Sequence, residues 1–81
     1  MRVVYTPTFK SNFKKFPNTT KNKFAKQIEY LLSDIRHPSL HAKKYSESEG
    51  IWQARVNRSI RFYFLIEKDT FTLLDITHHP K

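Results

Sequence analysis

Three arginines recur at intervals of three in the stretch GIWQARVNRSIRFYFLI, residues 50–66: Arg55, Arg58 and Arg61. The residues around them include isoleucine, tryptophan, valine, phenylalanine and tyrosine, which are typical of β-strands rather than helices. Guanidinium groups present a planar fork of donors that matches a phosphate group. The stretch therefore predicts either strands that carry phosphate-binding groups or strands with one ordinary solvated face.

A hairpin with its turn at residues 57–59 sorts the side chains of this stretch onto two faces. Side chains alternate along a strand, and directly opposite residues of an antiparallel pair share a face. With Val56 opposite Ile60, the core face carries only apolar residues: Trp52, Ala54, Val56, Ile60, Phe62 and Phe64. A register shifted by one residue would mix the apolar and polar sets, so the pattern selects this parity.

The other face of the predicted hairpin carries Gln53, Arg55, Arg61 and Tyr63, with the two arginines opposite each other. Like charges that face each other across strands destabilise a sheet by roughly 0.2–1 kcal/mol. Such a face is a poor core and an unfavourable bare surface, but it is a good place to hold a phosphate.

The same alternation can be continued into the last predicted strand, residues 71–79. It places Leu74 and Ile76 on the core face, and it adds four residues to the arginine face: Leu73, Asp75, Thr77 and His79. A second interpretation has equal standing on the pattern alone. In it, Asp75 forms a cross-strand ion pair with Arg61, and the face has no chemical role.

The remaining elements follow from periodicity and from helix start and stop signals. Residues 2–6 predict a short strand, and Thr6-Pro7 starts a helix that Pro17 ends. A second amphipathic helix begins within residues 18–20 and runs to Pro38, and the polar segment 39–50 is expected to be a loop. With strands at 51–57, 60–67 and 71–79, we predict a single α+β domain spanning 1–81. Its order is βααβββ, with a helical hairpin on one face of a small, mostly antiparallel four-stranded sheet.

Composition limits the class of partner. The 81 residues carry a net charge of +8 and no cysteine, which excludes a disulfide framework and a thiolate metal site or nucleophile. We expect no metal and no cofactor. A strongly basic chain indicates a polyanionic partner such as RNA, DNA or the ribosome. The N-terminal apolar run is too short for a signal peptide and no segment reaches membrane-spanning length, so we expect a cytoplasmic protein without a membrane partner.

The block AKKYSESEGIWQARVNRSIRFYFLI (42–66), the order of the elements and the terminal DITHHPK together resemble the RelE/ParE superfamily of bacterial toxins. The resemblance covers essentially the whole chain. It implies a toxin of a type II toxin–antitoxin system that cleaves mRNA on the ribosome, without a metal, by using the 2′-hydroxyl of the RNA as nucleophile. It also implies an antitoxin partner with an acidic or amphipathic segment, and a toxin–antitoxin hetero-oligomer.

The resemblance also suggests roles for individual residues. Arg61 matches a phosphate-stabilising arginine of the family, and Arg55 matches a basic residue on the preceding strand. Glu47 matches the carboxylate base of the YoeB-like branch, and His79 matches its near-terminal catalytic histidine. A histidine, whose pKa ordinarily lies near neutrality, could hold the proton for the leaving group. Three further residues are candidates for RNA contact: Lys43, Lys44 and Tyr63.

One departure from the family pattern leaves other functions open. Gln53 stands where RelE-like members often carry a catalytic lysine, and glutamine can serve neither as an acid nor as a base. The alternatives are a ParE-like inhibitor that binds DNA gyrase without catalysis and a non-toxic relative that binds nucleic acid or antitoxin.

Overall fold

A threonine at the end of the first strand starts the first helix. The Oγ1 of Thr6 accepts a hydrogen bond from the backbone N–H of Phe9 (3.2 Å), and Pro7 occupies the first helical position. The same hydroxyl donates to the carbonyl of Leu73 (2.9 Å), which ties the start of the helix to the last strand. The predicted helix start is therefore confirmed, and its position on the sheet is fixed by one side chain.

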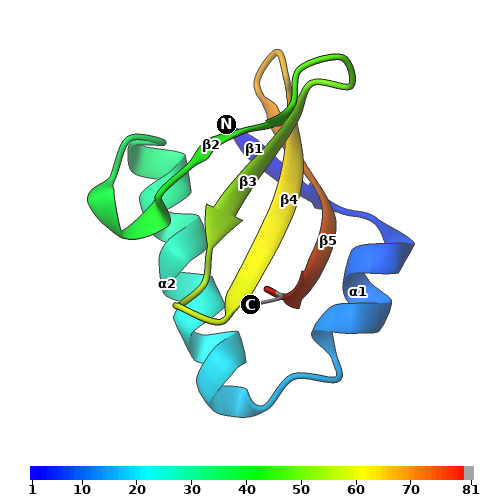
Figure 1. Ribbon diagram of the computed structural model, residues 1–81, viewed down its shortest axis with the longest axis vertical. Coiled ribbons are helices and arrows are strands. Elements are labelled where there is room, and N and C mark those ends of the chain that lie inside the picture. The colour runs from blue at the N-terminus through cyan, green and yellow to red at the C-terminus, as the bar shows by residue number, and fades with distance from the viewer. Residues whose placement is uncertain (80–81) are drawn as a thin grey trace.

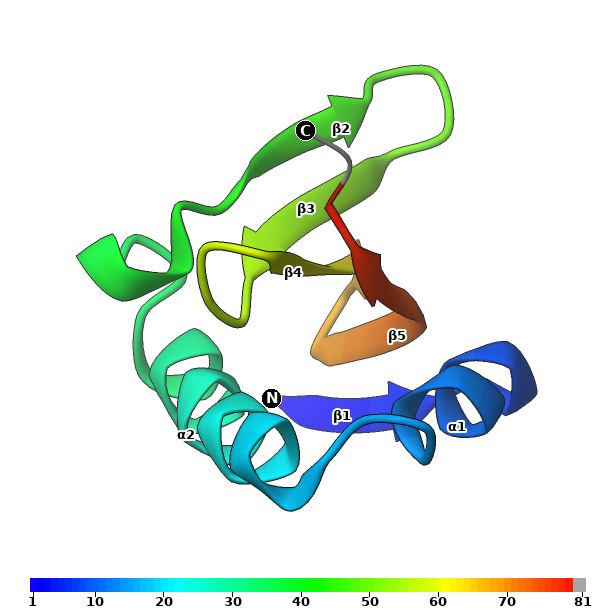
Figure 2. The same ribbon diagram turned by 60° about the horizontal axis from the view of Figure 1, so that its bottom comes forward.

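The computed structural model describes residues 1–79 and contains two helices and a five-stranded sheet (Figure 1). In chain order the elements are β1 (Arg2–Tyr5), α1 (Pro7–Phe13), α2 (Asn18–Ser33), the 3-10 turn η1 (Pro38–Leu40), β2 (Lys43–Ser46), β3 (Ile51–Arg55), β4 (Ile60–Glu67) and β5 (Thr70–His78). The strand order is β1-β5-β4-β3-β2, with β1 parallel to β5 and every other pair antiparallel. Figure 2 shows both helices on one side of this sheet. The predicted α+β architecture is thus confirmed.

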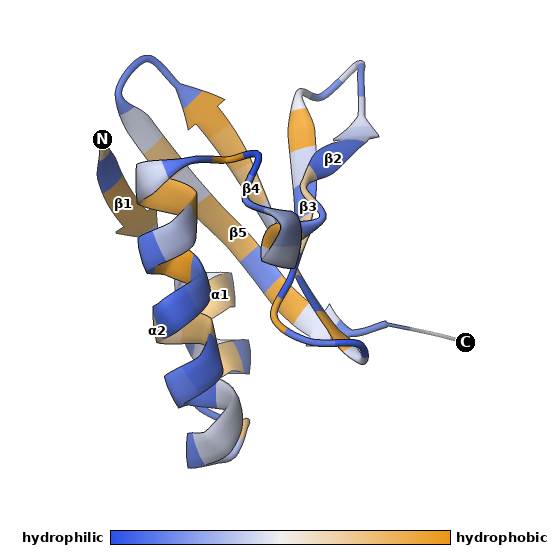
Figure 3. Cartoon of the chain, turned by 90° about the vertical axis from the view of Figure 1, so that its left-hand side faces the viewer, coloured by the Kyte–Doolittle hydropathy of each residue, from blue (hydrophilic) through white to orange (hydrophobic). Residues whose placement is uncertain are grey.

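The strand count was wrong by one. We predicted a loop for residues 39–50, but Lys43–Ser46 forms β2, which pairs with β3 at the edge of the sheet. This strand is hydrophilic along its length (Figure 3) and buries none of its side chains fully. An edge strand can be held by backbone pairing alone, so it needs no apolar alternation that the sequence could reveal.

Both helices are shorter than the prolines predicted. After Phe13 the backbone hydrogen bonds span three residues, as in a 3-10 helix. The N–H of Lys15 donates to the carbonyl of Asn12 (3.2 Å), and the N–H of Phe16 donates to the carbonyl of Phe13 (3.1 Å). The second helix ends at Ser33 because the side chain of Asp34 accepts from the N–H of Arg36 (2.9 Å), a local bond that competes with helix.

The predicted pairing of the two central strands is confirmed residue by residue. Ala54 lies opposite Phe62, Trp52 opposite Phe64, and Arg55 opposite Arg61. The N–H of Val56 donates to the carbonyl of Ile60 (2.9 Å), which closes the turn. The apolar side chains of these strands join the core under the helices, which includes Phe9, Phe24, Leu31, Phe62 and Phe64.

A bulge in β4–β5 corrects the predicted faces of the last strand. Tyr63 lies opposite Asp75, but the next residue, Phe64, lies opposite Leu73, so Leu74 is the extra residue. Leu73 is completely buried in the core, whereas Leu74 is only partly buried. Our assignment of Leu74 to the core and Leu73 to the arginine face was therefore wrong, while Ile76 is buried as predicted.

No helix among the described residues is long and apolar enough to cross a membrane.

Candidate nucleic-acid interface

The two facing arginines line a pocket of about 360 Å³, hereafter the arginine pocket. Its walls come from the segment before β2, from β2 itself, from β3 and β4, and from the end of the chain. The lining residues are His41, Ala42, Lys43, Gln53, Arg55, Arg61 and His79. Five of the seven are cationic or can become so, and no carboxylate is among them. The pocket can therefore attract an anion.

Arg61 is buried by the turn that precedes it. Its side chain and backbone together are only 6% exposed. The guanidinium Nη1 donates to the carbonyls of Asn57 (2.8 Å), Arg58 (3.2 Å) and Ile60 (3.3 Å). Within residues 1–79, Nη1 is the only atom of this guanidinium that forms hydrogen bonds, so its other N–H groups keep donors for a ligand.

Burial and the charge of Arg55 together make the environment of Arg61 unfavourable for a cation. Both lower the pKa of Arg61 from its ordinary value, and burial has the larger effect. The predicted alternative, an ion pair with Asp75, does not form. Asp75 instead accepts from the side-chain amide of Asn12 in α1 (2.6 Å), and the residue opposite Arg61 is Thr77. The two arginines thus face each other without a carboxylate between them.

Arg55 is positioned by a buried glutamine of α2. Gln27 is fully buried, and its Nε2 donates to the carbonyl of Arg55 (2.8 Å) and to that of Ser39 (3.1 Å). Its Oε1 accepts from the hydroxyl of Ser39 (3.0 Å). One polar side chain therefore fixes both β3 at Arg55 and the segment that leads to His41.

His79 and Lys43 reach the pocket from opposite sides. The backbone N–H of His79 donates to the carbonyl of Ser59 (2.7 Å), which holds His79 beside the turn that Arg61 binds. Lys43 lies opposite Gln53 in the β2–β3 pair and is exposed. The structure thus brings Arg55, Arg61 and His79 together, as the predicted arginine face requires, and adds Lys43 from β2.

His41 is a pocket residue that the sequence analysis missed. It is exposed and adopts a left-handed backbone conformation (φ 46°, ψ 42°) at the end of η1. Such a conformation is uncommon for a residue other than glycine. A sequence signal for His41 did exist. His41, Lys43 and Tyr45 are spaced by two residues, so they share one face if the strand at residues 43–46 is recognised.

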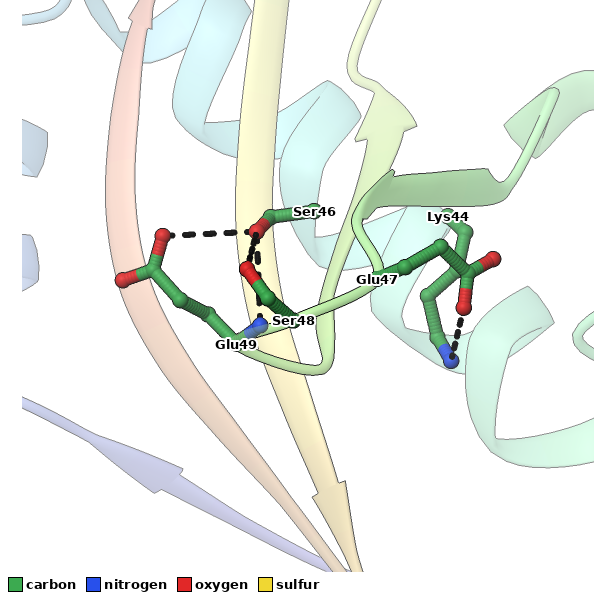
Figure 4. A network of polar contacts seen from close by, with 5 residues as sticks. All are labelled: Lys44, Ser46, Glu47, Ser48 and Glu49. Carbon is green, nitrogen blue, oxygen red and sulfur yellow. Dashed lines mark hydrogen bonds and ion pairs between the residues drawn. The ribbon is translucent and has the colours of Figure 1, made fainter.

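Glu47 and Lys44 lie outside the pocket. Lys44 faces the opposite side of β2, where its Nζ lies 5.2 Å from the centre of the Trp52 ring. Glu47 is 85% exposed and its carboxylate is 3.8 Å from the Nζ of Lys44, the only ion pair within residues 1–79. Figure 4 shows this pair on one side of the loop and the Ser46–Ser48–Glu49 contacts on the other. The geometry therefore offers no support for Glu47 as a base at the arginine pair.

Tyr63 lies on the same face of the sheet as Arg61, two residues further along β4. It is opposite Gln53, and its ring packs edge-on against that of Tyr45, with 5.0 Å between the ring centres. Tyr45 is 61% exposed, so an aromatic surface is open to solvent next to the arginine pocket. Exposed aromatic rings of this kind can stack on unpaired bases.

No three histidine or carboxylate side chains within residues 1–79 come together in a way that could hold a metal ion.

Comparison with known proteins shows similarity at the level of structure. No protein-family model matches the sequence, and no curated protein matches it. Among solved structures, the chain is similar to YafQ in the E. coli DinJ-YafQ toxin-antitoxin complex, with a TM-score of 0.78, 11% identity, and coverage of 95% of this chain and 90% of that one.

Two further structures give the same result. The RelB-RelE antitoxin-toxin complex from Methanococcus jannaschii matches with a TM-score of 0.77 and 17% identity, over 93% of this chain and 88% of that one. The YoeB/ParE toxin from Agrobacterium tumefaciens matches with a TM-score of 0.74 and 15% identity, over 99% and 100%. The resemblance inferred from the sequence is therefore confirmed for the fold: this chain has the fold of the RelE/ParE toxins.

Proposed function

We propose that this chain is the toxin of a type II toxin–antitoxin pair and that it cleaves mRNA on the ribosome. The observation that carries the proposal is the pair of facing arginines, Arg55 and Arg61, which line a pocket with no carboxylate among its lining residues. A buried cation without a counter-ion is unfavourable unless a ligand supplies the negative charge. The RelE/ParE fold and its toxin-antitoxin relatives support the same proposal. We propose the cytoplasm as its location, since the proposed substrate is bound to the ribosome.

The proposed reaction needs no cofactor. A base takes the proton of the RNA 2′-hydroxyl, and the oxygen attacks the adjacent phosphorus. The bond from phosphorus to the 5′-oxygen then breaks, an acid protonates that oxygen, and a 2′,3′-cyclic phosphate remains. The guanidinium groups of Arg55 and Arg61 stabilise the extra negative charge on the phosphorane, since charge-assisted hydrogen bonds are stronger than neutral ones.

Two histidines are available for the proton transfers. His41 and His79 both line the arginine pocket, whereas Glu47 lies outside it. We therefore assign His79 the role of acid, as the resemblance implies, and transfer the role of base from Glu47 to His41. Lys43 and Tyr63 are proposed to bind the RNA beside the cleaved bond. Lys44 contacts RNA in this proposal only outside the pocket, on the opposite face of β2.

Primer extension on a reporter mRNA translated in a reconstituted system tests the proposal. Wild-type protein should produce breaks at positions spaced by the reading frame, and Arg55→Gln should abolish them. Arg36→Gln is the matched control, because it removes the same charge from an exposed residue that does not line the pocket. Intact mRNA on actively translating ribosomes would refute the nuclease.

A gyrase inhibitor remains a second candidate because of one observation. Gln53 lines the pocket and no carboxylate does, so both the lysine and the carboxylate base that the resemblance associates with cleavage are absent from it. In this case the arginine pocket is a binding surface without catalysis. Inhibition of gyrase supercoiling by the wild-type protein, with mRNA left uncut, would favour this function over the first.

The proposed antitoxin has an acidic, amphipathic segment. The groove between α1 and α2, about 550 Å³, is lined by four phenylalanine and isoleucine side chains, and two lysines border it: Phe9, Phe13, Phe24, Ile28, Lys10 and Lys21. Apolar residues flanked by carboxylates would fit this groove. Co-expressed antitoxin should lose affinity when Ala25, which also lines the groove, is replaced by Glu, and it should bind Lys26→Glu on the outer side of α2 unchanged.

A further inference from the structure

A second basic pocket adjoins the arginine pocket at the β3–β4 turn. It has a volume of about 300 Å³, and four of its lining residues are basic: Lys23, His41, Arg55 and Arg58. They come from α2, the segment after η1, the end of β3 and the turn. No carboxylate lines this pocket either, and neither Lys23 nor Arg58 forms an ion pair within residues 1–79.

The two pockets share His41 and Arg55. Arg55 is therefore placed between two anion-attracting cavities, with Arg61 on one side and Arg58 on the other. A single phosphate would occupy only one of these cavities. The arrangement instead suits a ligand with several linked phosphates.

The aromatic pair of Tyr45 and Tyr63 lies on the side of the arginine pair away from the second basic pocket. Along β3, the position of Gln53, where Tyr63 and Tyr45 pack, lies two residues from Arg55, a separation of about 7 Å at 3.4 Å per residue. Beyond Arg55, the turn carries Arg58. The order along the strand is thus an aromatic surface, then the arginine pair, then the second basic pocket. A single-stranded nucleic acid presents bases and phosphates in this manner.

We propose that the second pocket binds a further phosphate of the same RNA strand, next to the phosphate held by Arg55 and Arg61. This inference rests on the proposed function, since it extends the path of the RNA across that site. Lys23 and Arg58 supply the charge, and His41 and Arg55 lie between the two phosphates. The exposed Tyr45 and the half-buried Tyr63 take a base on the opposite side of the arginine pair.

The test is the salt dependence of binding to 2′-O-methyl oligoribonucleotides, which lack the free 2′-hydroxyl and so cannot be cleaved by the proposed reaction. Each phosphate of a single strand that the protein neutralises contributes about 0.7 to the slope of log K against log salt. The Lys23→Ala/Arg58→Ala double variant should therefore reduce the slope for a hexanucleotide by about 0.7, the contribution of the one phosphate in the second pocket. Its affinity for a dinucleotide with one phosphate should stay at the wild-type value.

The matched control is Lys26→Ala/Arg36→Ala, which lowers the net charge by the same amount at exposed positions outside both pockets. If both double variants change the hexanucleotide slope equally, the second pocket is not a subsite. Lys23→Ala alone, with half the expected effect, serves as a variant that leaves the turn untouched. Failure of the wild-type protein to bind the hexanucleotide would also overturn the inference.

This result is separable from that of the cleavage assay. Binding that depends on Lys23 and Arg58, together with uncut mRNA, would retain the RNA path and refute the nuclease. Cleaved mRNA, together with a slope that Lys23 and Arg58 do not affect, would retain the nuclease and refute the second subsite.

Discussion

Arg55→Gln should stabilise the fold and weaken anion binding at the same time. In the structure Arg55 lies directly opposite the buried Arg61, and no carboxylate separates them. Removing one of two like charges at opposing strand positions relieves roughly 0.2–1 kcal/mol. The bond that Gln27 donates to residue 55 goes to the backbone carbonyl, so the substitution leaves it in place.

The magnitude can be converted into measurable shifts. For a domain of 60–100 residues, 1 kcal/mol changes Tm by about 4–8 °C, so Arg55→Gln should raise Tm by about 1–8 °C at low salt. Near 1 M salt the Debye length is about 3 Å, and most of this gain should disappear. A hydrogen bond to a charged group contributes about 1.5–3 kcal/mol, so affinity for the oligonucleotide should fall roughly ten- to hundredfold.

Thermal unfolding followed by circular dichroism and fluorescence anisotropy with labelled RNA measure the two effects. Arg36→Gln is again the control, and it should change neither quantity by more than the loss of one distant charge. The reasoning is wrong if Arg55→Gln lowers Tm at low salt, since that would mean that Arg55 is a structural residue. Unchanged RNA affinity in a stabilised variant would equally remove Arg55 from the site.

Three further substitutions test how the site is held in place. Gln27→Leu leaves the partly buried carbonyls of Ser39 and Arg55 without a donor, at about 1–3 kcal/mol each, and should lower the free energy of unfolding by about 2–6 kcal/mol in urea titrations. A loss below 1 kcal/mol would contradict this role. Arg61→Lys keeps the charge but not the fork that reaches three carbonyls, so it should destabilise the protein by about 1–3 kcal/mol, and wild-type stability would show that these bonds contribute little. Burial raises the pKa of Tyr5 from its ordinary value of 10.0. The contribution of this residue to stability is therefore complete below that pH and is lost as the pH rises through the folded-state pKa. In denaturant titrations above about pH 10, the Tyr5→Phe variant should lose less stability than the wild-type protein.

The hairpin of β3 and β4 could be predicted from sequence because its pattern admits one parity. Apolar and polar residues alternate from Trp52 to Val56 and again from Ile60 to Phe64, on either side of the turn, and a register of opposite parity buries an arginine in the core. Burial of one face against the helices then enforces the register. The arginine face, and with it Arg55, Arg61 and Tyr63 on one side of the sheet, follows from that constraint alone.

The sequence could not indicate the bulge in β5. Leu73 and Leu74 are adjacent and identical in type, so hydrophobicity does not distinguish which of them enters the core. The bulge between Tyr63 and Phe64 decides it, because an extra residue in one strand reverses the parity beyond it. The edge strand β2 was missed for a related reason. A strand that is paired on one side and solvated on both faces needs no periodic pattern, so His41 was left off the arginine face.

Arg61 combines a structural role, which the sequence did not indicate, with the proposed role in phosphate binding. Three turn carbonyls hold its Nη1, so the guanidinium is oriented before any ligand arrives. An anion that binds the remaining donors needs no reorganisation of this side chain, which is the condition under which electrostatic stabilisation is most effective. The structural bonds therefore strengthen the case for phosphate binding. The turn makes Arg61 rigid, Gln27 fixes Arg55 opposite it, and the repulsion between the two arginines is an unfavourable term that a bound phosphate would relieve.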